Sequence, residues 1–413
     1  MSNTAAVDSN YAWARLFACL ALTTIGSAGM YVVVVALPAF QVDFAISRAG
    51  ASLPFTMVML GFGIGGIVTG RLVDRYGVAL PIAGCAVALC LSLLGAAHAP
   101  NYPMFLLAHV ALGWFGPAAT FGPLLADISK WFAKRRGLAV AIAASGNYLA
   151  GALWPRPLYQ MLEANGWRDT YSTMAMLSVV VMLPLILMLR AKPERVAVAV
   201  SHGGSAGSPA ELGLTPASLT ALLCLAGVGC CVAMAMPQVH LVSLCADRGF
   251  GAARGAEMLS LMLGCGIISR LVFGQLSDRL GGLRTLLISG ILQGLALLMF
   301  LPAQGMVALY AASALFGLFQ GGIVPSYALI VREYFPESQA GGRIGLIIFA
   351  TIVGMAFGGW GSGAIYDLSH SYTMAFVHGI GWNLVNVWVT VFLLSRARHR
   401  GQRTENGGAM ATA

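Results

Sequence analysis

Long apolar segments follow one another along almost the whole chain, and this succession restricts the fold more than any other feature. The hydrocarbon core of a bilayer is about 30 Å thick, and a helix needs about 20 apolar residues to cross it. Charged residues and polar clusters separate twelve such segments: 13–38, 50–70, 78–98, 102–127, 137–160, 167–190, 216–245, 255–277, 283–302, 305–331, 343–366 and 372–395. The sequence therefore predicts an all-α membrane protein with twelve transmembrane helices.

The composition excludes several classes of protein. Only 9% of the residues are charged, against roughly a quarter in an average soluble domain, which excludes a soluble enzyme, a nucleic-acid reader and a disordered scaffold. The eight cysteines lie within or at the ends of apolar segments, without a Cys-x-x-C motif or a paired histidine. They are interpreted as packing thiols, so we expect no metal and no cofactor. The segments contain no nucleophile–base pair, so we expect no enzyme activity.

The positive charges are unevenly distributed between the two predicted sides of the membrane. Of the 24 Lys and Arg, 18 fall on the side that carries both chain ends, and only four on the other: Arg48, Arg168, Arg248 and Arg254. Cytoplasmic loops carry the excess of Lys and Arg in membrane proteins. The sequence predicts a multi-pass protein of the cell inner (plasma) membrane with both termini in the cytoplasm.

One polar stretch divides the chain. Residues 191–216 contain three charged residues near their start and then Ser201–Ser208, which is rich in Ser and Gly. Such a composition is typical of a flexible linker. We predict an N-terminal six-helix half at residues 1–190, a cytoplasmic linker at 191–216, a C-terminal six-helix half at 217–395 and a cytoplasmic tail at 396–413.

The two halves share a short motif. Residues 70–77 read GRLVDRYG and residues 274–281 read GQLSDRLG, so five of eight positions are identical at a spacing of 204 residues. Each copy is expected in the connection after the second span of its half. The glycines allow close helix approach, and the aspartates lie near helix ends, where they can meet a helix N-terminus or a basic residue. The motif residues of interest are Gly70, Asp74, Arg75, Gly274, Asp278 and Arg279.

The repeated pattern G-x-L-x-D-R-x-G closely resembles that of the major facilitator superfamily, and the resemblance extends over the whole chain. It implies a transporter whose two halves are related by an axis along the membrane normal. It also implies that the motif residues form a latch that holds the cytoplasmic side shut and releases when that side opens. The alternative is an ordinary charged turn that only sets the topology.

A narrower resemblance is to the oxalate/formate antiporter and monocarboxylate porter group of that superfamily. The stretches that carry it are 236–242 (MPQVHLV), 247–249 (DRG), 269–274 (SRLVFG) and 166–171 (GWRDTY). The resemblance implies transport of small organic anions, often monocarboxylates with a proton. It also places the group's anion-binding arginine in span eight, where this chain has Arg270.

Arg270 is the most informative single residue. It lies about fifteen residues into span eight, where an arginine costs at least about 2.5–3.5 kcal/mol on insertion scales and needs a partner or a cavity. Its planar fork suits a carboxylate, although an arginine that snorkels to the interface is the alternative. Dicarboxylate-exchanging relatives carry a lysine in span eleven, and residues 343–366 contain none. One cation matches one carboxylate, so the sequence favours a monocarboxylate.

Other polar and aromatic residues are weaker candidates. His240 and Asp247, in the outer part of span seven, are the candidate proton carriers, and a packed histidine is the alternative for the former. Asn147 lies at mid-depth in span five and suits a hydroxyl or keto oxygen. The aromatic candidates could equally be helix packing. The predicted substrate-binding set is Arg270, Asn147, His240, Tyr31, Phe121 and Tyr148.

These observations predict a secondary active transporter of small monocarboxylates such as lactate or pyruvate, coupled to protons and working by alternating access. The expected partners are a small organic anion, a proton and the lipid bilayer, with no nucleic acid, and the expected state is a monomer. The alternative is an obligate organic-anion exchanger of the oxalate/formate type. A transceptor or other signalling membrane protein is the candidate from another class.

Overall fold

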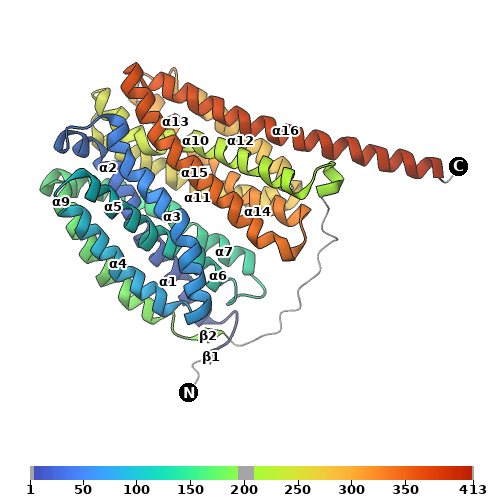
Figure 1. The fold of residues 1–413 in the computed structure, drawn as a ribbon, viewed down its shortest axis with the longest axis horizontal. Helices are drawn as coiled ribbons and strands as arrows, with labels where there is room; N and C mark the ends of the chain where they lie inside the picture. Colours follow the sequence, from blue (N-terminus) through green and yellow to red (C-terminus); the bar gives the residue numbers. More distant parts are fainter. Residues whose placement is uncertain (1–3, 194–208, 412–413) are drawn as a thin grey trace.

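The structure is a computed structural model that describes residues 4–193 and 209–411, and it is built almost wholly of helices (Figure 1). The first described part contains β1 (Thr4–Ala5), α1 (Asn10–Gly26), α2 (Ala28–Asp43), α3 (Arg48–Tyr76), α4 (Ala79–Ala97), α5 (Tyr102–Gly113), the π-helix η1 (Trp114–Ala118), α6 (Gly122–Ile128), α7 (Arg136–Ala144), α8 (Gly146–Leu153), α9 (Pro155–Leu187) and β2 (Lys192–Pro193). The second contains the 3₁₀-helix η2 (Pro209–Leu212), α10 (Pro216–Asp247), α11 (Ala252–Leu280), α12 (Gly282–Phe300), α13 (Met306–Gln320), α14 (Ile323–Tyr334), α15 (Glu337–Ser369) and α16 (Tyr372–Ala411).

The helices cross the membrane twelve times. Within the described ranges, 11 helical segments are long and apolar enough to cross a membrane. One of them, Arg136–Leu187, has 52 residues, and a helix rises only about 1.5 Å per residue, so this segment is too long for one crossing. Its backbone leaves the helical conformation at Gly166, whose φ is 78°, and the segment makes two crossings there. The predicted all-α fold with twelve spans is confirmed.

Four of the crossings are interrupted, which the sequence analysis did not anticipate. The first breaks at Ser27, the fifth at Ser145 and the tenth at Gly321 and Gly322, while the fourth contains the π-helix η1. Small residues at these positions let neighbouring helices approach closely, and broken helices are tolerated in a membrane where they are buried in protein. At the break in the fifth crossing, the backbone carbonyl of Ala144 accepts a hydrogen bond from a side chain of another helix, that of Arg270.

The internal repeat is visible in the packing. A Cβ atom on Gly113 of α5 would overlap the carbonyl oxygen of Val58 on α3. A Cβ atom on Gly317 of α13 would overlap the carbonyl oxygen of Met262 on α11 in the same way, and both positions are 204 residues further along the chain. The same pair of helices is therefore packed backbone to backbone in each half.

The repeated motif lies mostly within helices, which corrects the expectation that it forms the connections. α3 continues to Tyr76 and α11 to Leu280, so only the final glycine of each copy leaves the helix. Gly77 and Gly281 have φ values of 79° and 78°, a left-handed conformation that favours glycine and ends the helix.

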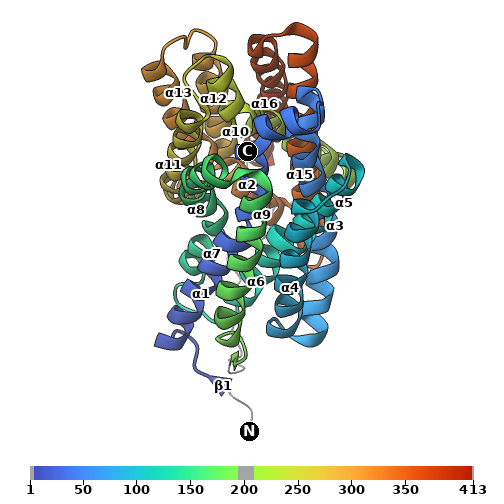
Figure 2. The ribbon, with the colours of Figure 1, turned by 90° about the vertical axis from the view of Figure 1, so that its left-hand side faces the viewer.

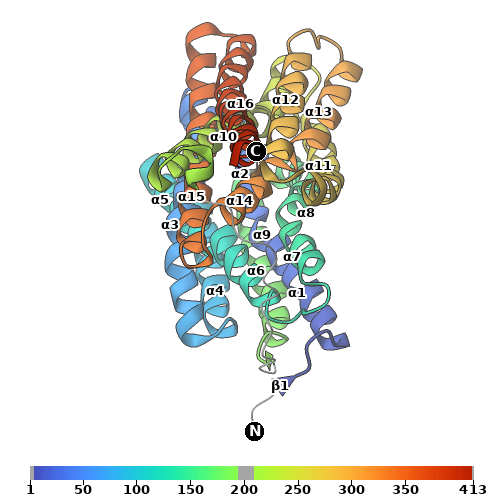
Figure 3. The ribbon, with the colours of Figure 1, turned by 90° about the vertical axis from the view of Figure 1, so that its right-hand side faces the viewer.

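The helices α1–α9 form one half of the molecule and α10–α16 the other, as Figures 2 and 3 show from two sides. An even number of crossings puts both chain ends on one side, here called the terminal face, and the opposite side is the far face. β1 and β2 pair in parallel on the terminal face. The predicted domain limits stay a prediction, because residues 194–208 of the linker and 412–413 of the tail lie outside the described residues.

Candidate functional site

The two halves are joined at the far face by an ion pair. α3 begins at Arg48 because Ser47 caps the helix, accepting a hydrogen bond from the backbone of Gly50. Arg48 Nη2 donates to both carboxylate oxygens of Asp247 at the end of α10, at 3.0 and 2.8 Å. Asp367 of α15 accepts from the backbone N–H groups of Arg48 and Ala49, both at 2.8 Å. Two helices of the second half, α10 and α15, therefore converge on the first turn of α3.

Aromatic rings and a histidine surround this ion pair. The guanidinium carbon of Arg48 lies 4.9 Å from the ring centroid of Tyr366 and 6.0 Å from that of Tyr372. His240, about two turns before Asp247 on α10, is fully buried, and its Nε2 lies 2.7 Å from the carbonyl oxygen of Gly359. Its Nδ1 is buried without a hydrogen-bond partner in the described part of the chain. The two predicted proton carriers thus belong to the far-face cluster.

Below this cluster, the halves stay in contact along two seams towards mid-membrane. On the first, between α3 and α15, Thr56 Oγ1 donates to the carbonyl oxygen of Ala356 at 3.0 Å. On the second, between α8 and α11, Gly151 packs against Leu263 and Gly266 packs against Tyr148. These close approaches use glycine as transmembrane helix interfaces commonly do.

The seams end before the terminal face. A Cβ atom added to Gly70 of α3, Gly345 of α15, Gly137 of α7 or Gly274 of α11 would meet nothing within 4 Å. The helices of the two halves diverge on that side in Figure 1. The described contacts between the halves thus gather at the far face and in mid-membrane, and the helices of the two halves separate towards the terminal face.

Arg270 lies where the second seam ends. Its Nη1 donates to the carbonyl oxygen of Ala144 at 2.9 Å, and its guanidinium carbon lies 4.5 Å from the ring centroid of Tyr148. Ala144 is the last residue of α7, so its carbonyl belongs to a helix C-terminus, which attracts a cation. Arg270 Nε is buried without a partner, and none of the ion pairs among the described residues involves Arg270. The charge is therefore partly satisfied by dipoles and has no counter-ion among the side chains that the structure describes.

Three of the other predicted substrate residues gather near Arg270. Tyr31 Oη donates to the backbone carbonyl of Asn147 at 3.0 Å, and Tyr148 is the ring beneath the guanidinium. The side-chain Oδ1 of Asn147 is buried without a described partner. Phe121 packs its ring against Phe62, with centroids 6.2 Å apart. The structure thus brings Tyr31, Asn147 and Tyr148 together, whereas His240 lies in the far-face cluster.

The predicted latch residues lie at the terminal face, where the helices of the two halves diverge. Asp74, Arg75, Asp278 and Arg279 are all exposed. Neither aspartate takes part in an ion pair among residues 4–193 and 209–411. A latch that holds the terminal face shut would be released in such an arrangement, so their role as a latch stays a prediction.

Sequence reasoning missed two charged contacts. It assigned Arg48 only to the outer loops and did not pair it with Asp247, although a scarcity of cations on that side was a usable signal. It also missed the pair inside the first half, where Arg15 Nε lies 2.8 Å from Asp127 Oδ2 and the arginine side chain is 1% exposed. Arg15 also donates to the carbonyl of Met188, which ties spans one, four and six together at the terminal face.

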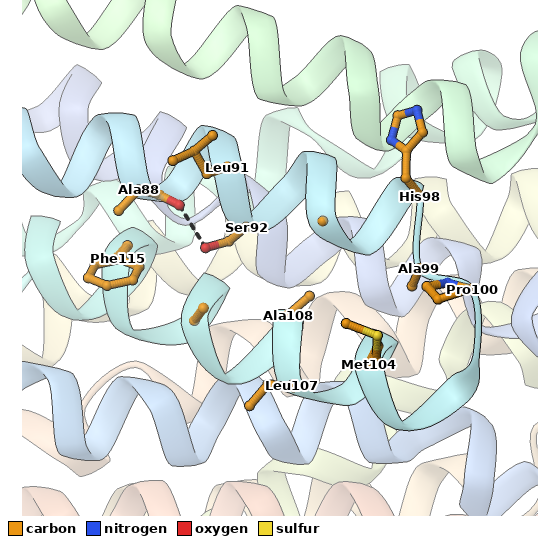
Figure 4. Close-up of a pocket in the computed structure, with 12 residues that line it drawn as sticks. Ala88, Leu91, Ser92, His98, Ala99, Pro100, Met104, Leu107, Ala108 and Phe115 are labelled. Atoms are coloured by element: carbon orange, nitrogen blue, oxygen red, sulfur yellow. Dashed lines mark hydrogen bonds between the residues drawn. The ribbon is translucent and has the colours of Figure 1, made fainter.

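A surface groove between α4 and α5 is separate from these residues (Figure 4). It has a volume of about 540 Å³, and its polar side chains are Ser92 and His98. Ser92 Oγ donates to Ala88 of its own helix at 2.7 Å, and neighbouring Leu91 and Leu107 are exposed. The groove belongs to the lipid-facing side of the first half and offers no charge to an anion.

The comparisons with known proteins identify the family. The sequence matches the Major Facilitator Superfamily over residues 19–306 and again over 221–411, and the chain belongs to this superfamily of membrane transporters. The MFS-type transporter pynF of Aspergillus niger is 25% identical over 335 residues, which cover 81% of this chain and 76% of that protein. Monocarboxylate transporter 13 of Rattus norvegicus is 28% identical over 342 residues, covering 79% and 75%.

A solved structure has the same fold. The D-xylose-proton symporter superposes with a TM-score of 0.71 at 14% sequence identity, over 93% of this chain and 97% of that one. The predicted superfamily is therefore confirmed, while the predicted anion-porter subgroup is not settled by relatives this distant.

Proposed function

We propose that this transporter moves small monocarboxylates, such as lactate or pyruvate, by alternating access between its two faces. The observation that carries the proposal is Arg270, a half-buried arginine in mid-bundle without a carboxylate partner in the described part of the chain. A planar guanidinium binds a carboxylate through two parallel hydrogen bonds. The similarity to a monocarboxylate transporter supports the same substrate class.

The position of Arg270 fits a carrier that loads from the terminal face. The contact between Arg270 and Ala144 lies at the end of the seam, directly above the diverging helices. An anion that enters from that side would neutralise the arginine and reduce the cost of burying it when the terminal face closes. The excess of Lys and Arg on the terminal face supports a cytoplasmic orientation of that face in the inner membrane.

Proton coupling is proposed to act through the far-face cluster. Arg48 is hydrogen-bonded to Asp247, Asp367 accepts from the backbone of the same turn, and Tyr366, Tyr372 and His240 are the other titratable groups there. A proton on Asp247 would replace the ion pair with a weaker neutral hydrogen bond and so favour opening of the far face. A carrier with no such proton step would instead be an obligate anion exchanger.

Counterflow in proteoliposomes tests the substrate class. Proteoliposomes that contain the purified protein are loaded with unlabelled lactate, pyruvate, formate or oxalate, and the uptake of each labelled anion is measured. The chemical identity of the anion taken up is checked afterwards. We expect unchanged lactate and pyruvate to exchange and oxalate, with two carboxylates, to exchange poorly. Exchange of oxalate alone would favour the oxalate-type exchanger, and no anion exchange at all would refute the proposal.

A further inference from the structure

A second polar feature faces the interior, on α10. Every residue from Gly229 to Cys245 is buried except Gln238, whose side chain is partly exposed. α10 is surrounded by α11, α15 and α16 and, across the halves, by α2. The exposed part of Gln238 therefore opens into the bundle and not towards lipid.

Gln238 is joined to a second glutamine at the break in the tenth span. Its Nε2 lies 3.0 Å from Oε1 of Gln320, the last residue of α13. Gln320 is only 1% exposed, and its Nε2 is buried without a partner among the residues described. An unpaired buried amide nitrogen is costly in a membrane protein, so it points to a ligand that the site has yet to receive.

The amide pair lies beside the helix that carries Arg270. Gly321, which follows Gln320, donates its backbone N–H to Ser269 Oγ at 3.0 Å. A Cβ atom on Gly321 would lie 2.7 Å from the backbone nitrogen of Arg270. The amide pair and the arginine are therefore contributed by adjoining turns of packed helices, α13 and α11.

When two side-chain amides share one hydrogen bond, a defined set of their donors and acceptors remains without a partner. Whichever amide donates, one whole NH2 group and one carbonyl oxygen remain without a partner, and the donating nitrogen keeps its second N–H, because each amide has two N–H groups and one carbonyl oxygen. A hydroxyl group is the substituent that satisfies both, since it donates one hydrogen bond and accepts others. A methyl group satisfies neither, and a keto oxygen or a second carboxylate can only accept.

We propose that the amide pair of Gln238 and Gln320 binds a hydroxyl group of the transported anion, so that the substrate class is the hydroxymonocarboxylates. This inference rests on the proposed function, in which Arg270 binds the carboxylate. Arg270 and the amide pair, carried by adjoining turns of α11 and α13, would then bind the carboxylate and the hydroxyl group of the same small molecule. A site built to bind a hydroxyl group discriminates strongly against the analogue that lacks it.

The test compares lactate, propionate and pyruvate, which share a three-carbon carboxylate and differ in the substituent at the second carbon. Competition against labelled lactate is first measured in the wild-type protein in proteoliposomes. We expect the concentration of propionate that halves uptake of labelled lactate to be at least roughly 10-fold higher than that of unlabelled lactate, and the concentration of pyruvate to lie between the two. Equal competition by lactate and propionate in the wild type would overturn the inference without any variant.

The variants Gln238→Met and Gln320→Met keep the side-chain size and remove the amide. Each is expected to remove most of the preference for lactate over propionate while propionate exchange is retained. The matched control is Gln293→Met, because Gln293 is a buried glutamine bonded to Asn383 and to the carbonyl of Cys230 within the second half. The control is expected to keep the wild-type preference.

The outcomes separate the two proposals. Unchanged preference in both variants, with Arg270→Ala inactive, would overturn the role of the amide pair and leave the proposed function standing. Exchange of none of the three anions by the wild type would refute the proposed function and, with it, this inference.

Discussion

Arg48 of the first half and Asp247 of the second form a two-oxygen ion pair at the far face, with the guanidinium side chain only 6% exposed. The residues are 199 positions apart, and each lies at the end of its helix. Because the pair crosses the interface between the halves, it can exist only while the far face is closed. It is thus a marker of the conformation as well as a stabilising contact.

Breaking this pair is expected to favour the far-face-open conformation. Asp247→Asn and Arg48→Gln remove the charge interaction, and because Arg48 is buried while Asp247 is exposed, we expect the loss to be about 1.5–3 kcal/mol, as for a hydrogen bond to a charged group. A Thr56→Cys reporter lies on the closed seam, and we expect an impermeant thiol reagent added at the far face to label it faster in both variants. Arg168→Gln, which breaks an exposed pair with Asp43 inside the first half, is the control.

Proton coupling is tested at the same cluster. Asp247→Asn is expected to lose accumulation driven by a pH gradient while it keeps substrate exchange, because exchange does not require the empty carrier to reorient. Accumulation and counterflow of labelled lactate are compared for this variant and for His240→Ala. If both variants still accumulate substrate against its gradient under a pH drive, coupling through these residues is excluded and anion exchange becomes the better account.

The latch is tested at the terminal face. We expect Asp74→Asn and Asp278→Asn to leave the observed conformation unaffected, because both side chains are exposed in it, and to destabilise the conformation in which the terminal face is closed. We expect lower flux, little change in affinity and faster labelling of a Leu72→Cys reporter from the terminal face. Asp169→Asn, exposed at the start of the sixth crossing, is the matched control. If both latch variants are labelled at the rate of the parent protein, the motif is not a latch, and the alternative of a charged turn that only sets the membrane topology is favoured.

The repeated glycine contacts make a prediction about stability. Gly113→Ala and Gly317→Ala each force a methyl group against a backbone carbonyl, and we expect each to cost about 1–3 kcal/mol. Gly84→Ala on α4 is the control, since a Cβ atom there meets nothing within 4 Å and alanine favours a helix by up to about 1 kcal/mol. Thermal unfolding in detergent measures all three. A melting temperature that falls as much in the control as in the other two would contradict the packing argument.

The sequence predicts the crossings and the repeat because both depend on local composition. Segment length counts the helices, and the identical motif copies indicate the relation that Gly113 and Gly317 later show in the packing. The breaks at Ser27 and Ser145 escape prediction because a small polar residue in an apolar run is compatible with a continuous helix. Their cause is the close approach of another helix, which a single sequence does not record.

The candidate site was predictable in part for the same reason. Arg270 is conspicuous because a cation inside an apolar segment is rare. The pairing of Arg48 with Asp247, and that of Gln238 with Gln320, depends on how helices that are far apart in the sequence pack against one another. Side chains 199 and 82 positions apart are joined only after the halves and their broken helices have packed.

Counterflow of labelled lactate by Arg270 variants in proteoliposomes tests the central claim most directly. Arg270→Ala is expected to abolish exchange, and Arg270→Lys, which keeps the charge but loses the planar fork, to weaken binding by about 1–3 kcal/mol. Arg284→Ala, an exposed arginine at the start of α12, is the control and should exchange normally. Exchange by Arg270→Ala at the wild-type rate, with equal amounts of protein inserted, would contradict the account.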